Sequence, residues 1–384
     1  MLSVTDYGAL IADPVRMGAF TTGLKRTVTP DSVVIDLGTG TGICALIACA
    51  LGARKVYAIE SDDVIEVARS IAATNGYADR IEFHHAVSGD VVLPERGDVI
   101  VADMAGMLPW FHRGILSIID ARRRMLKPQG VVLPQRDVVW TAVVEAEEMY
   151  FRHTGAWRGN QFAFDMEAAR DLAVNAWSRG RFTSDQLLAS PRRWCVLDYK
   201  TIDDATARGT MECVISRRGV GHGLAAGFDR VVIDGVEISN APDRPDAVKP
   251  TLICEPVFFP WLEPVPLDAG DTVNVEISGV LVRQDYVWSW KTHVRSASGD
   301  TKAPFNQSTF LSTPLSAASL KKRTPGYVPS LTNEGRVMLM VLAAMAERQP
   351  CGEIARRVVE LMPTRFTKPA DALAFVSDLV AQYG

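Results

Sequence analysis

Three glycines and an acid are spaced along the chain in a way that suits binding of a nucleoside. The stretch VVIDLGTGTGICAL places Gly38, Gly40 and Gly42 between an apolar run and a helical pattern. Glycines at such a turn let the backbone bend sharply and let a ligand approach closer than side chains would permit. Glu60 ends the next apolar run, eighteen residues after Gly42, where a carboxylate can hold two ribose hydroxyls. The spacing therefore predicts a nucleoside-containing cofactor.

Three kinds of glycine turn fit this pattern: a site for S-adenosylmethionine, a dinucleotide site and a purely structural turn. Ile43 stands where a dinucleotide fingerprint carries its last glycine, so the motif is G-x-G-x-G. Asp36 precedes the glycines on the same apolar run, and Val87 with Ser88 follows the third such run. Four features in register favour a cofactor site over a structural turn.

A second candidate site lies in VADMAGMLPWFH, residues 101–112. Asp103 follows a buried apolar run, at the end of a strand where open α/β sheets bind ligands. His112 titrates near neutral pH when it is unperturbed, so it has the pKa of a general base. One acid that orients an acceptor and one imidazole that takes a proton would form a catalytic pair. The alternative for His112 is a role in capping or packing the loop beside Trp110 and Phe111.

The periodicity of the sequence predicts the elements that carry these residues. Apolar runs alternate with helical patterns over residues 29–144, which is typical of a doubly wound, mostly parallel Rossmann-like sheet. Short β-like runs over 194–293 predict an antiparallel β sandwich or barrel, with a helical insertion at 166–177 before it. About three amphipathic helices close the chain. The expected fold class is α/β, followed by an antiparallel β domain and a small helical domain.

These patterns divide the chain into five parts. We expect N-terminal helices that cover the cofactor at 1–28, a cofactor-binding Rossmann-like domain at 29–145, a β-barrel substrate domain with the helical insertion at 146–295, a linker at 296–314 and a helical domain at 315–384. The linker is expected from its Ser, Thr, Pro and Ala content.

Composition excludes several classes of function. The net charge of −4 gives no electrostatic reason to bind nucleic acid. No apolar run reaches the roughly 18–20 residues of a membrane span, and the first residues lack the pattern of a secretion signal. The six cysteines have no ligand or disulfide spacing, so we expect no metal site. A cytoplasmic protein without a membrane or nucleic-acid partner is expected.

From about residue 7 to residue 290 the chain resembles the protein arginine methyltransferase family, whose cofactor is S-adenosylmethionine. The resemblance begins in YGALIADPVRMGAF, which is similar to that family's opening helix and its D-x-V-R element. It implies that Arg16 binds the cofactor carboxylate, an arrangement suited to a bidentate guanidinium. The residues implied for the rest of the cofactor are Asp36, Gly38 and Gly40 for the methionine part, Glu60 for the ribose, and Val87 with Ser88 for the adenine. The family's usual homodimer is implied as well.

The chain departs from the family on the substrate side. Asp103 and His112 stand where the family has two glutamates that grip the substrate guanidinium, and an imidazole cannot replace a carboxylate in a clamp for a cation. Leu252 and Ile253 stand where the family has His and Trp of its Thr-His-Trp stretch. Methyl transfer is therefore expected, to an acceptor unusual for the family: a peptide side chain or a natural-product intermediate.

Two other functions stay open. One is a true arginine or guanidine methyltransferase that uses Asp103 with an acid from elsewhere, and the other is a non-catalytic cofactor-binding protein that docks partners. The last seventy residues weakly resemble the winged-helix-like, peptide-binding fold of the pyrroloquinoline-quinone chaperone, with GEIARRV at 352–358 as the key stretch. That resemblance implies a leader peptide held by β-strand addition. A helical cap or a dimer contact is the alternative.

Overall fold

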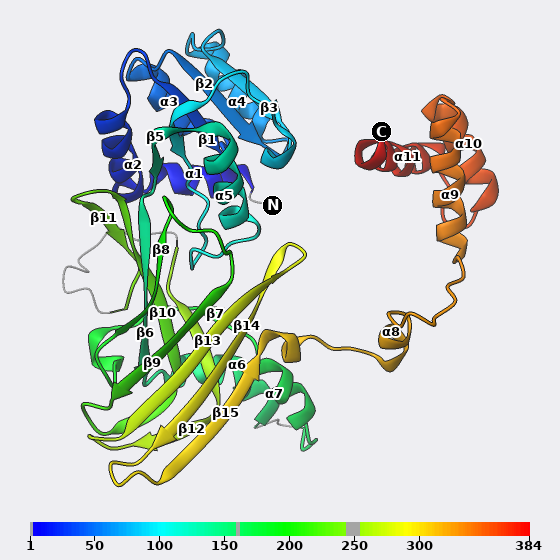
Figure 1. The fold of residues 1–384 in the computed structure, drawn as a ribbon. Helices are drawn as coiled ribbons and strands as arrows, with labels where there is room; N and C mark the ends of the chain where they lie inside the picture. The colour runs from blue at the N-terminus through cyan, green and yellow to red at the C-terminus, as the bar shows by residue number, and fades with distance from the viewer. Residues whose placement is uncertain (1–2, 159–161, 243–253) are drawn as a thin grey trace. The chain divides into compact units, whose positions relative to one another are not determined.

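The computed structural model describes residues 3–158, 162–242 and 254–384 of the chain. The chain divides into two units, Met1–Pro314 and Leu315–Gly384. The first unit contains a parallel sheet and then two antiparallel sheets, and the second contains helices (Figure 1). The predicted fold class, a Rossmann-like sheet followed by antiparallel strands and C-terminal helices, is confirmed.

Five apolar runs form the parallel sheet, in the order β3-β2-β1-β4-β5. Their bounds are β1 Val33–Leu37, β2 Lys55–Glu60, β3 Ile81–His85, β4 Gly97–Val101 and β5 Leu126–Leu133. In the register between the two central strands, Asp36 of β1 lies opposite Val101 of β4. Because the strands are parallel, the residues that follow β1 and β4 meet at the same edge of the sheet.

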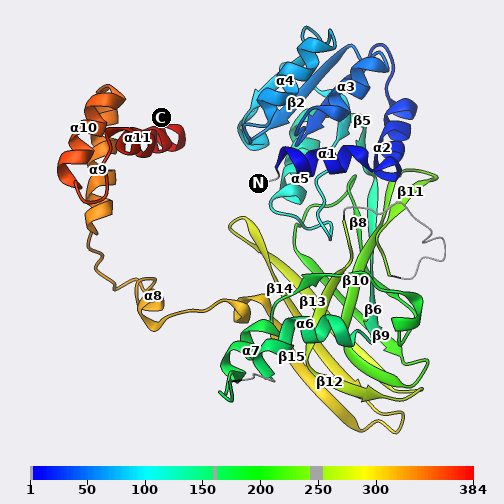
Figure 2. The ribbon, with the colours of Figure 1, turned by 180° about the vertical axis from the view of Figure 1, so that it is seen from behind.

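Helices cover both faces of this sheet, as its doubly apolar strands require. The helices are α2 Pro14–Thr27, α3 Ile43–Ala50, α4 Ile65–Thr74 and α5 Gly114–Met125. Val34 packs with α2 and α3, whereas Ile35, the next residue of β1, packs with α5. The face that carries α5 is continuous with the core of the antiparallel half, so the two halves share one apolar interior. Figure 2 shows the two halves of the first unit lying next to each other.

Local caps set the start of the two N-terminal helices. Ser3 caps α1, Val4–Ala12, in a capping box with Asp6. Asp13 caps α2 by accepting hydrogen bonds from the backbone N–H groups of Val15 and Arg16. The α2 cap therefore places Arg16 in the first turn of a helix that packs against the sheet.

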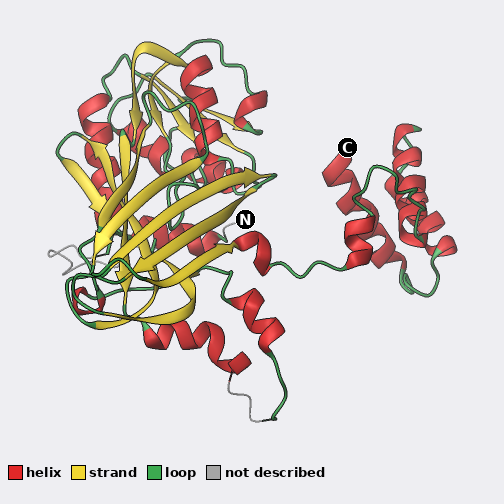
Figure 3. Ribbon diagram, turned by 60° about the horizontal axis from the view of Figure 1, so that its bottom comes forward, coloured by secondary structure: helices red, strands yellow, loops and turns green. Residues whose placement is uncertain are grey.

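Two antiparallel sheets form the second half of the first unit (Figure 3). One has the order β7-β12-β10-β6-β8 with β11 beside β10, and the other has the order β15-β14-β13-β9. Their bounds are β6 Arg136–Val144, β7 Ser178–Arg179, β8 Arg192–Asp198, β9 Ala207–Val214, β10 Gly219–Ile233, β11 Val236–Ser239, β12 Val257–Leu267, β13 Thr272–Val282, β14 Asp285–Arg295 and β15 Thr301–Ser308.

Two of the predicted boundaries differ from the structure. Strand β6 pairs with β10 and β8, so the antiparallel half begins at Arg136 rather than at residue 146. Strand β15 lies inside the predicted linker, 296–314, and pairs with β14 along the edge of its sheet. Its alternate residues Ala303, Phe305 and Gln307 are buried. An edge strand tolerates Pro304 and polar residues on its outer face. Because this composition is also typical of a linker, the strand was predicted as one.

The segment between β6 and β7 holds two helices, α6 Glu147–Arg158 and α7 Glu167–Ala173. The second lies within the predicted helical insertion, whereas the first was not anticipated. Arg170 of α7 is buried and donates to the hydroxyl of Tyr150 on α6 at 3.2 Å, and it forms an ion pair with Glu263 at 2.5 Å. These contacts attach the insertion to β12.

The second unit is built from helices: α8 Ala317–Lys321, α9 Asn333–Ala346, α10 Cys351–Leu361 and α11 Pro369–Tyr383. Val341, Val358 and Val376 form the centre of a small apolar core between the last three. The residues from 315 to 384 are all described and include no strand. The wing strands of a winged helix are therefore missing, and the resemblance to the quinone chaperone is limited to helices. Within the described residues, every helix is too short or too polar to cross a membrane.

Candidate active site

The glycine loop follows β1 and leads directly into α3. Gly38, Gly40 and Gly42 have φ angles of 71°, 54° and 85°, in the left-handed region that favours glycine, and Gly42 caps α3. A Cβ atom at Gly40 would collide with the ring of Tyr7 on α1. The loop therefore offers bare backbone at the edge of the sheet, with α1 beside it, as the cofactor prediction requires.

Asp36 is a buried acid just before this loop. Its Oδ2 accepts hydrogen bonds from the hydroxyl of Thr39 at 2.5 Å and from the backbone N–H of Ala45 at 2.9 Å. Burial raises the pKa of Asp36 to about 7, although the two hydrogen bonds act in the opposite direction. This carboxyl group ties the loop to the first turn of α3.

Glu60 ends β2 and faces the same loop. Its Oε2 accepts a hydrogen bond from the backbone N–H of Gly40 at 3.0 Å, and its Oε1 accepts from Ser61 at 2.8 Å and Asp62 at 3.1 Å. Three backbone donors fix the orientation of this carboxylate. A carboxylate held at the end of the second strand is the group expected to bind ribose hydroxyls.

The residues predicted for the adenine follow β3 at the same edge. Val87 exposes about half of its surface, at 53%, whereas Ser88 is buried and begins a short 3₁₀ turn. The backbone carbonyl of Ser88 accepts a hydrogen bond from Arg124 of α5 at 2.8 Å. The structure thus gathers Asp36, the glycines, Glu60, Val87 and Ser88 at the carboxyl ends of β1, β2 and β3.

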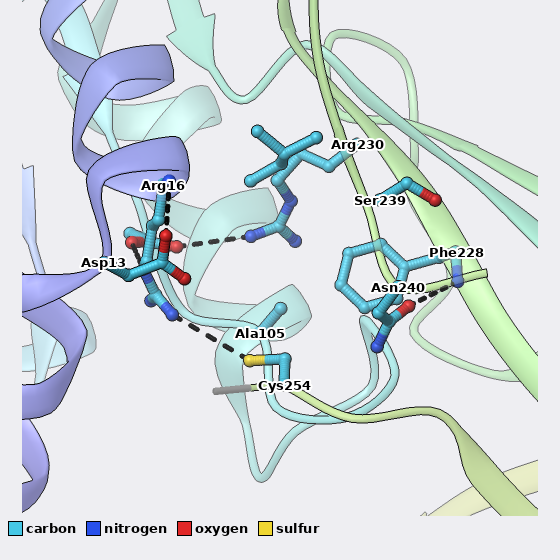
Figure 4. Close-up of a pocket in the computed structure, with 10 residues that line it drawn as sticks. Asp13, Arg16, Ala105, Phe228, Arg230, Ser239, Asn240 and Cys254 are labelled. Carbon is cyan, nitrogen blue, oxygen red and sulfur yellow. Dashed lines mark hydrogen bonds and ion pairs between the residues drawn. The ribbon is translucent and has the colours of Figure 1, made fainter. Parts of the chain in front are cut away.

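Arg16 and Asp103 meet across the edge of the sheet. The Nε of Arg16 lies 2.5 Å from Oδ2 of Asp103, and both side chains are largely buried. A second nitrogen of Arg16 lies 3.8 Å from the sulfur of Cys254. Arg16, which the resemblance assigns to the cofactor carboxylate, is therefore held by an acid of the protein itself. Figure 4 shows Arg16 beside Cys254 and Arg230.

Arg230 of β10 is a member of this site that the sequence analysis did not identify. One guanidinium nitrogen lies 3.3 Å from Oδ1 of Asp103, and two others donate to Asp137 of β6 at 2.9 and 2.7 Å. Tyr199 donates its hydroxyl to the same Asp137 at 2.6 Å. Burial alone would lower the pKa of Arg230, but Asp137 and Asp103 raise it above its ordinary value.

These groups line a very small cavity. Its described lining includes Asp13, Arg16, Asp103, Arg230 and Cys254, and its volume is about 30 Å³. Each carboxylate oxygen of Asp103 faces a guanidinium group of the chain. A substrate guanidinium would therefore compete with Arg16 and Arg230 for Asp103 in this arrangement.

His112 lies in a different place from Asp103. Its Nδ1 is 3.0 Å from Oδ1 of Asp285 and 3.2 Å from the carbonyl oxygen of Gln284, in the turn before β14. His112 also has a left-handed φ of 45°, which is unusual for a residue with a side chain. It lines a second cavity, of about 240 Å³, whose described lining does not include Asp103.

Asp103 and His112 thus have different partners and line different cavities in the structure, and their catalytic role stays a prediction. The loop between the two residues turns so that each lines its own cavity and takes its own partners, because Arg16 and Arg230 occupy the acid while Asp285 attracts the imidazole. The predicted departure at Leu252 and Ile253 lies outside the described residues. Among the described residues, no group of three or more His, Cys, Asp or Glu side chains is placed to hold a metal ion.

One sequence signal pointed toward the missed residues. Asp137 and Arg230 stand inside otherwise apolar runs, RDVVWTAVV and GFDRVVI. Charged residues are rarely buried unless they are paired, so two such residues of opposite sign suggest a buried ion pair. The register confirms that they lie directly opposite each other on β6 and β10. Their contact with Asp103 depends on how the two halves pack.

The chain is similar to known methyltransferases in sequence. The family model for the ribosomal protein L11 methyltransferase matches residues 21–157. Protein arginine N-methyltransferase 2 of human is 30% identical over 276 residues, which cover 69% of this chain and 62% of that protein. The mouse protein of the same name is 31% identical over 261 residues, covering 64% of this chain and 56% of that protein. The chain thus spans about 60% of the length of these relatives.

Solved structures share the fold. Protein arginine methyltransferase 10 of Arabidopsis thaliana superposes with a TM-score of 0.68 at 20% identity, covering 80% of this chain and 97% of that chain. A Trypanosoma brucei arginine methyltransferase enzyme–prozyme complex with AdoHcy superposes with a TM-score of 0.70 at 19% identity, covering 79% and 96%. At these identities the likeness establishes the architecture alone.

Proposed function

We propose that this chain is an S-adenosylmethionine-dependent methyltransferase with arginine-methyltransferase-like architecture and an acceptor other than arginine. The names of its relatives and the match to a methyltransferase family model support the reaction. The residues at the ends of the strands fit the cofactor: a glycine loop with no room for a Cβ at Gly40, and a fixed carboxylate at Glu60. When bound, this cofactor supplies an electrophilic methyl group on its sulfonium.

The observation that supports this choice of acceptor is that two guanidinium groups of the chain contact Asp103. Arg16 binds one of its oxygens at 2.5 Å and Arg230 approaches the other at 3.3 Å. A carboxylate that already faces two guanidinium groups exerts little net attraction on a cationic substrate. His112, in place of a second acid, supplies no negative charge either. The site therefore suits a neutral acceptor better than an arginine side chain.

The chain's own residues then act mainly by positioning. Methyl transfer is an in-line displacement, so the chain's residues have to align the acceptor's lone pair with the methyl group. Glu60 and the glycine loop would hold the cofactor, and Arg16 with Asp103 would fix the α2 end of the site. Because His112 is half exposed and bound to Asp285, the acceptor's proton leaves to solvent in this mechanism rather than to a pair formed with Asp103.

The decisive experiment locates the methyl group. The purified chain is incubated with methyl-labelled S-adenosylmethionine and either cell extract or a peptide library, and the products are mapped by mass spectrometry. We expect label on a residue or small molecule other than arginine. Monomethyl or dimethyl arginine as the main product would overturn the proposed acceptor. The Gly40→Val variant, which cannot hold the loop conformation, provides the cofactor-binding control.

A matched variant tests the role of Asp103. Asp103→Asn keeps the shape of the side chain and removes its charge, so Arg16 and Arg230 lose their common partner. We expect turnover to fall on the order of 10–100-fold because the acceptor site loses its alignment. The affinity for S-adenosylhomocysteine should change little, as measured by isothermal titration calorimetry. Unchanged turnover would remove Asp103 from the site.

The alternative function is a genuine arginine or guanidine methyltransferase, and the names of the relatives favour it. It requires Arg230 to leave Asp103 when substrate binds, together with a second acid from another segment. A non-catalytic cofactor-binding protein is the other candidate, and binding of S-adenosylmethionine without labelled product in any extract would favour it.

The partner and location predictions belong to the same proposal. A homodimer is expected by analogy with the family and is tested by sedimentation at several concentrations. If the second unit binds a leader peptide, it does so between helices, because residues 315–384 offer no strand edge for β-strand addition. The expected location is the cytoplasm.

A further inference from the structure

The second cavity, lined by His112, is built from aromatic side chains. Its volume is about 240 Å³, and its walls come from the loop after β4, from β12 and from β14. The described lining residues are Met107, Leu108, Trp110, Phe111, His112, Trp177, Val257, Phe259, Asp285, Tyr286 and Trp288. A dry apolar cavity of about 150 Å³ is large enough to bind benzene, so this one has room for a substituted ring.

The rings of the walls stand at angles that suit a further ring. Trp110 and Trp288 meet edge to face, with centroids 5.7 Å apart and planes at 82°. Phe259 and Tyr286 lie tilted against Trp288, with centroids 5.9 and 6.1 Å away. Edge-to-face and offset contacts at these distances are the preferred geometries of aromatic pairs. A planar guest in the cavity would meet rings that already pack in these geometries.

The charges at the cavity favour a neutral guest. Among the described lining residues, the acid is Asp285 and the base is His112, and they lie 3.0 Å apart. Each of the two side chains is therefore the polar partner of the other. Both side chains are well exposed, at 81% and 47%, so they stand toward solvent rather than among the buried rings.

We infer that this cavity holds a neutral aromatic ring, such as a phenol or an indole, carried by the methyl acceptor. The inference rests on the proposed function, because it describes the substrate of the proposed enzyme. It names a chemical class that the cofactor side does not specify. The ring would be held by a set of residues that does not include Asp103.

Binding of simple probes to the full chain tests this without turnover. Isothermal titration calorimetry is run with N-acetyl-tyrosinamide, N-acetyl-leucinamide and N-acetyl-argininamide, each with and without S-adenosylhomocysteine. The tyrosine phenol is neutral at pH 7. We expect the tyrosine probe to bind at least tenfold more tightly than the other two. Equal binding of the leucine probe, or preferred binding of the arginine probe, would overturn the inference.

Two variants with matched controls locate the binding. Met107→Trp fills the cavity from a partly exposed loop position, and Leu311→Trp adds the same bulk at an exposed position outside the lining. Trp177→Ala removes part of a wall, and Phe310→Ala removes an exposed ring elsewhere. Both cavity variants should weaken the tyrosine probe at least tenfold, and both controls should leave it unchanged. Unchanged binding in the two cavity variants would overturn the inference.

The two proposals fail in different ways. Melting temperature and affinity for S-adenosylhomocysteine serve as checks that every variant is folded. If the chain binds the tyrosine probe but never binds the cofactor or transfers a methyl group, the proposed function is wrong and the cavity still binds a ring. If it transfers methyl groups but shows no preference for ring probes, the inference alone is wrong.

Discussion

The cofactor side and the acceptor side of the candidate site are built in different ways. On the cofactor side, backbone groups of the glycine loop and of Ser61 surround Glu60, and all of these lie within 25 residues of one another in the chain. On the acceptor side, Asp103 meets Arg16 from 87 residues upstream and Arg230 from 127 residues downstream. The first arrangement depends on local conformation, whereas the second depends on the packing of both halves of the unit.

Because of this difference, we expect a change of substrate to alter the acceptor side and to leave the cofactor side unchanged. Local backbone geometry presents the same shape whatever the acceptor is, so the cofactor side tolerates a change of substrate. The acceptor side has no fixed backbone cradle, and its character is set by which charges neutralise Asp103. Four substitutions test this contrast.

The largest effect is expected from Arg230→Leu. It leaves Asp137, which is completely buried, without its counter-charge, and breaking such a pair costs about 3–5 kcal/mol. Urea denaturation of the variant should show that loss in the free energy of unfolding. The double variant Arg230→Leu with Asp137→Leu should recover much of it, because no charge is left buried. A loss below about 1 kcal/mol in the single variant would mean that the acceptor side is not a structural network.

The buried acid of the cofactor side should give a pH-dependent effect. The pKa of Asp36 is raised to about 7, so between about pH 4 and pH 7 the folded state binds more protons there than the unfolded state does. Stability from this group is therefore greatest at low pH and falls as the pH rises to 7. Asp36→Asn mimics the protonated acid and removes this dependence.

Unfolding free energies of the wild type and of Asp36→Asn, measured from pH 4.5 to pH 8, test this prediction. The advantage of the variant should grow with pH and level off above 7, reaching a few kcal/mol at most, on the order of 4. A difference that is constant across this range would show that the carboxyl group is already ionised in the folded protein at low pH.

A moderate effect is expected at Glu60. Glu60→Gln keeps one of the two oxygens that accept from backbone N–H groups, turns the other into an amide donor, and replaces the charged acceptor for ribose hydroxyls with a neutral one. Affinity for S-adenosylhomocysteine should fall roughly tenfold, since a charged hydrogen bond contributes about 1.5–3 kcal/mol. Calorimetry measures it, with Glu66→Gln, an exposed acid of α4, as the control. Equal loss in both variants would assign the effect to net charge rather than to the site.

The smallest effect is expected at His112. Its pair with Asp285 is exposed, so His112→Ala should change the free energy of unfolding by less than about 1 kcal/mol. Turnover with the true acceptor should stay within about threefold, less than the loss typical of a general base. A fall of a hundredfold or more, with a changed pH–rate profile, would restore His112 as the base. The loop after β4 would then determine the chemistry of the acceptor side.

The sequence predicted the parts of the molecule that depend on neighbouring residues. The glycine loop, Asp36 and Glu60 share one continuous pattern of strand, turn and helix, and the parallel sheet followed from the same periodicity. The antiparallel half was predicted in kind, yet β6 was assigned to the wrong sheet. A run of alternating apolar residues predicts a strand but does not show which neighbouring strand it pairs with.

The residues that surround Asp103 were out of reach for the same reason. Arg230 becomes part of the site only because β10 pairs with β6 and brings the guanidinium within 3.3 Å of Asp103, two residues after the end of β4. The orientation of His112 depends on Asp285, from a turn 173 residues away in the chain. The residue types at Asp103 and His112 predicted a departure from the family that the chain resembles, and the packing determines which partners these two residues have.

The cross-strand pair of Asp137 and Arg230 joins the acceptor site to the fold itself. Any lineage that changes Arg230 to admit a cationic substrate must first lose the counter-charge of a buried aspartate. Such a change is accessible by two coordinated substitutions and is blocked as a single one. The proposed acceptor preference is thus tied to the stability of the fold, because a change at Arg230 alone would leave the buried Asp137 without its counter-charge.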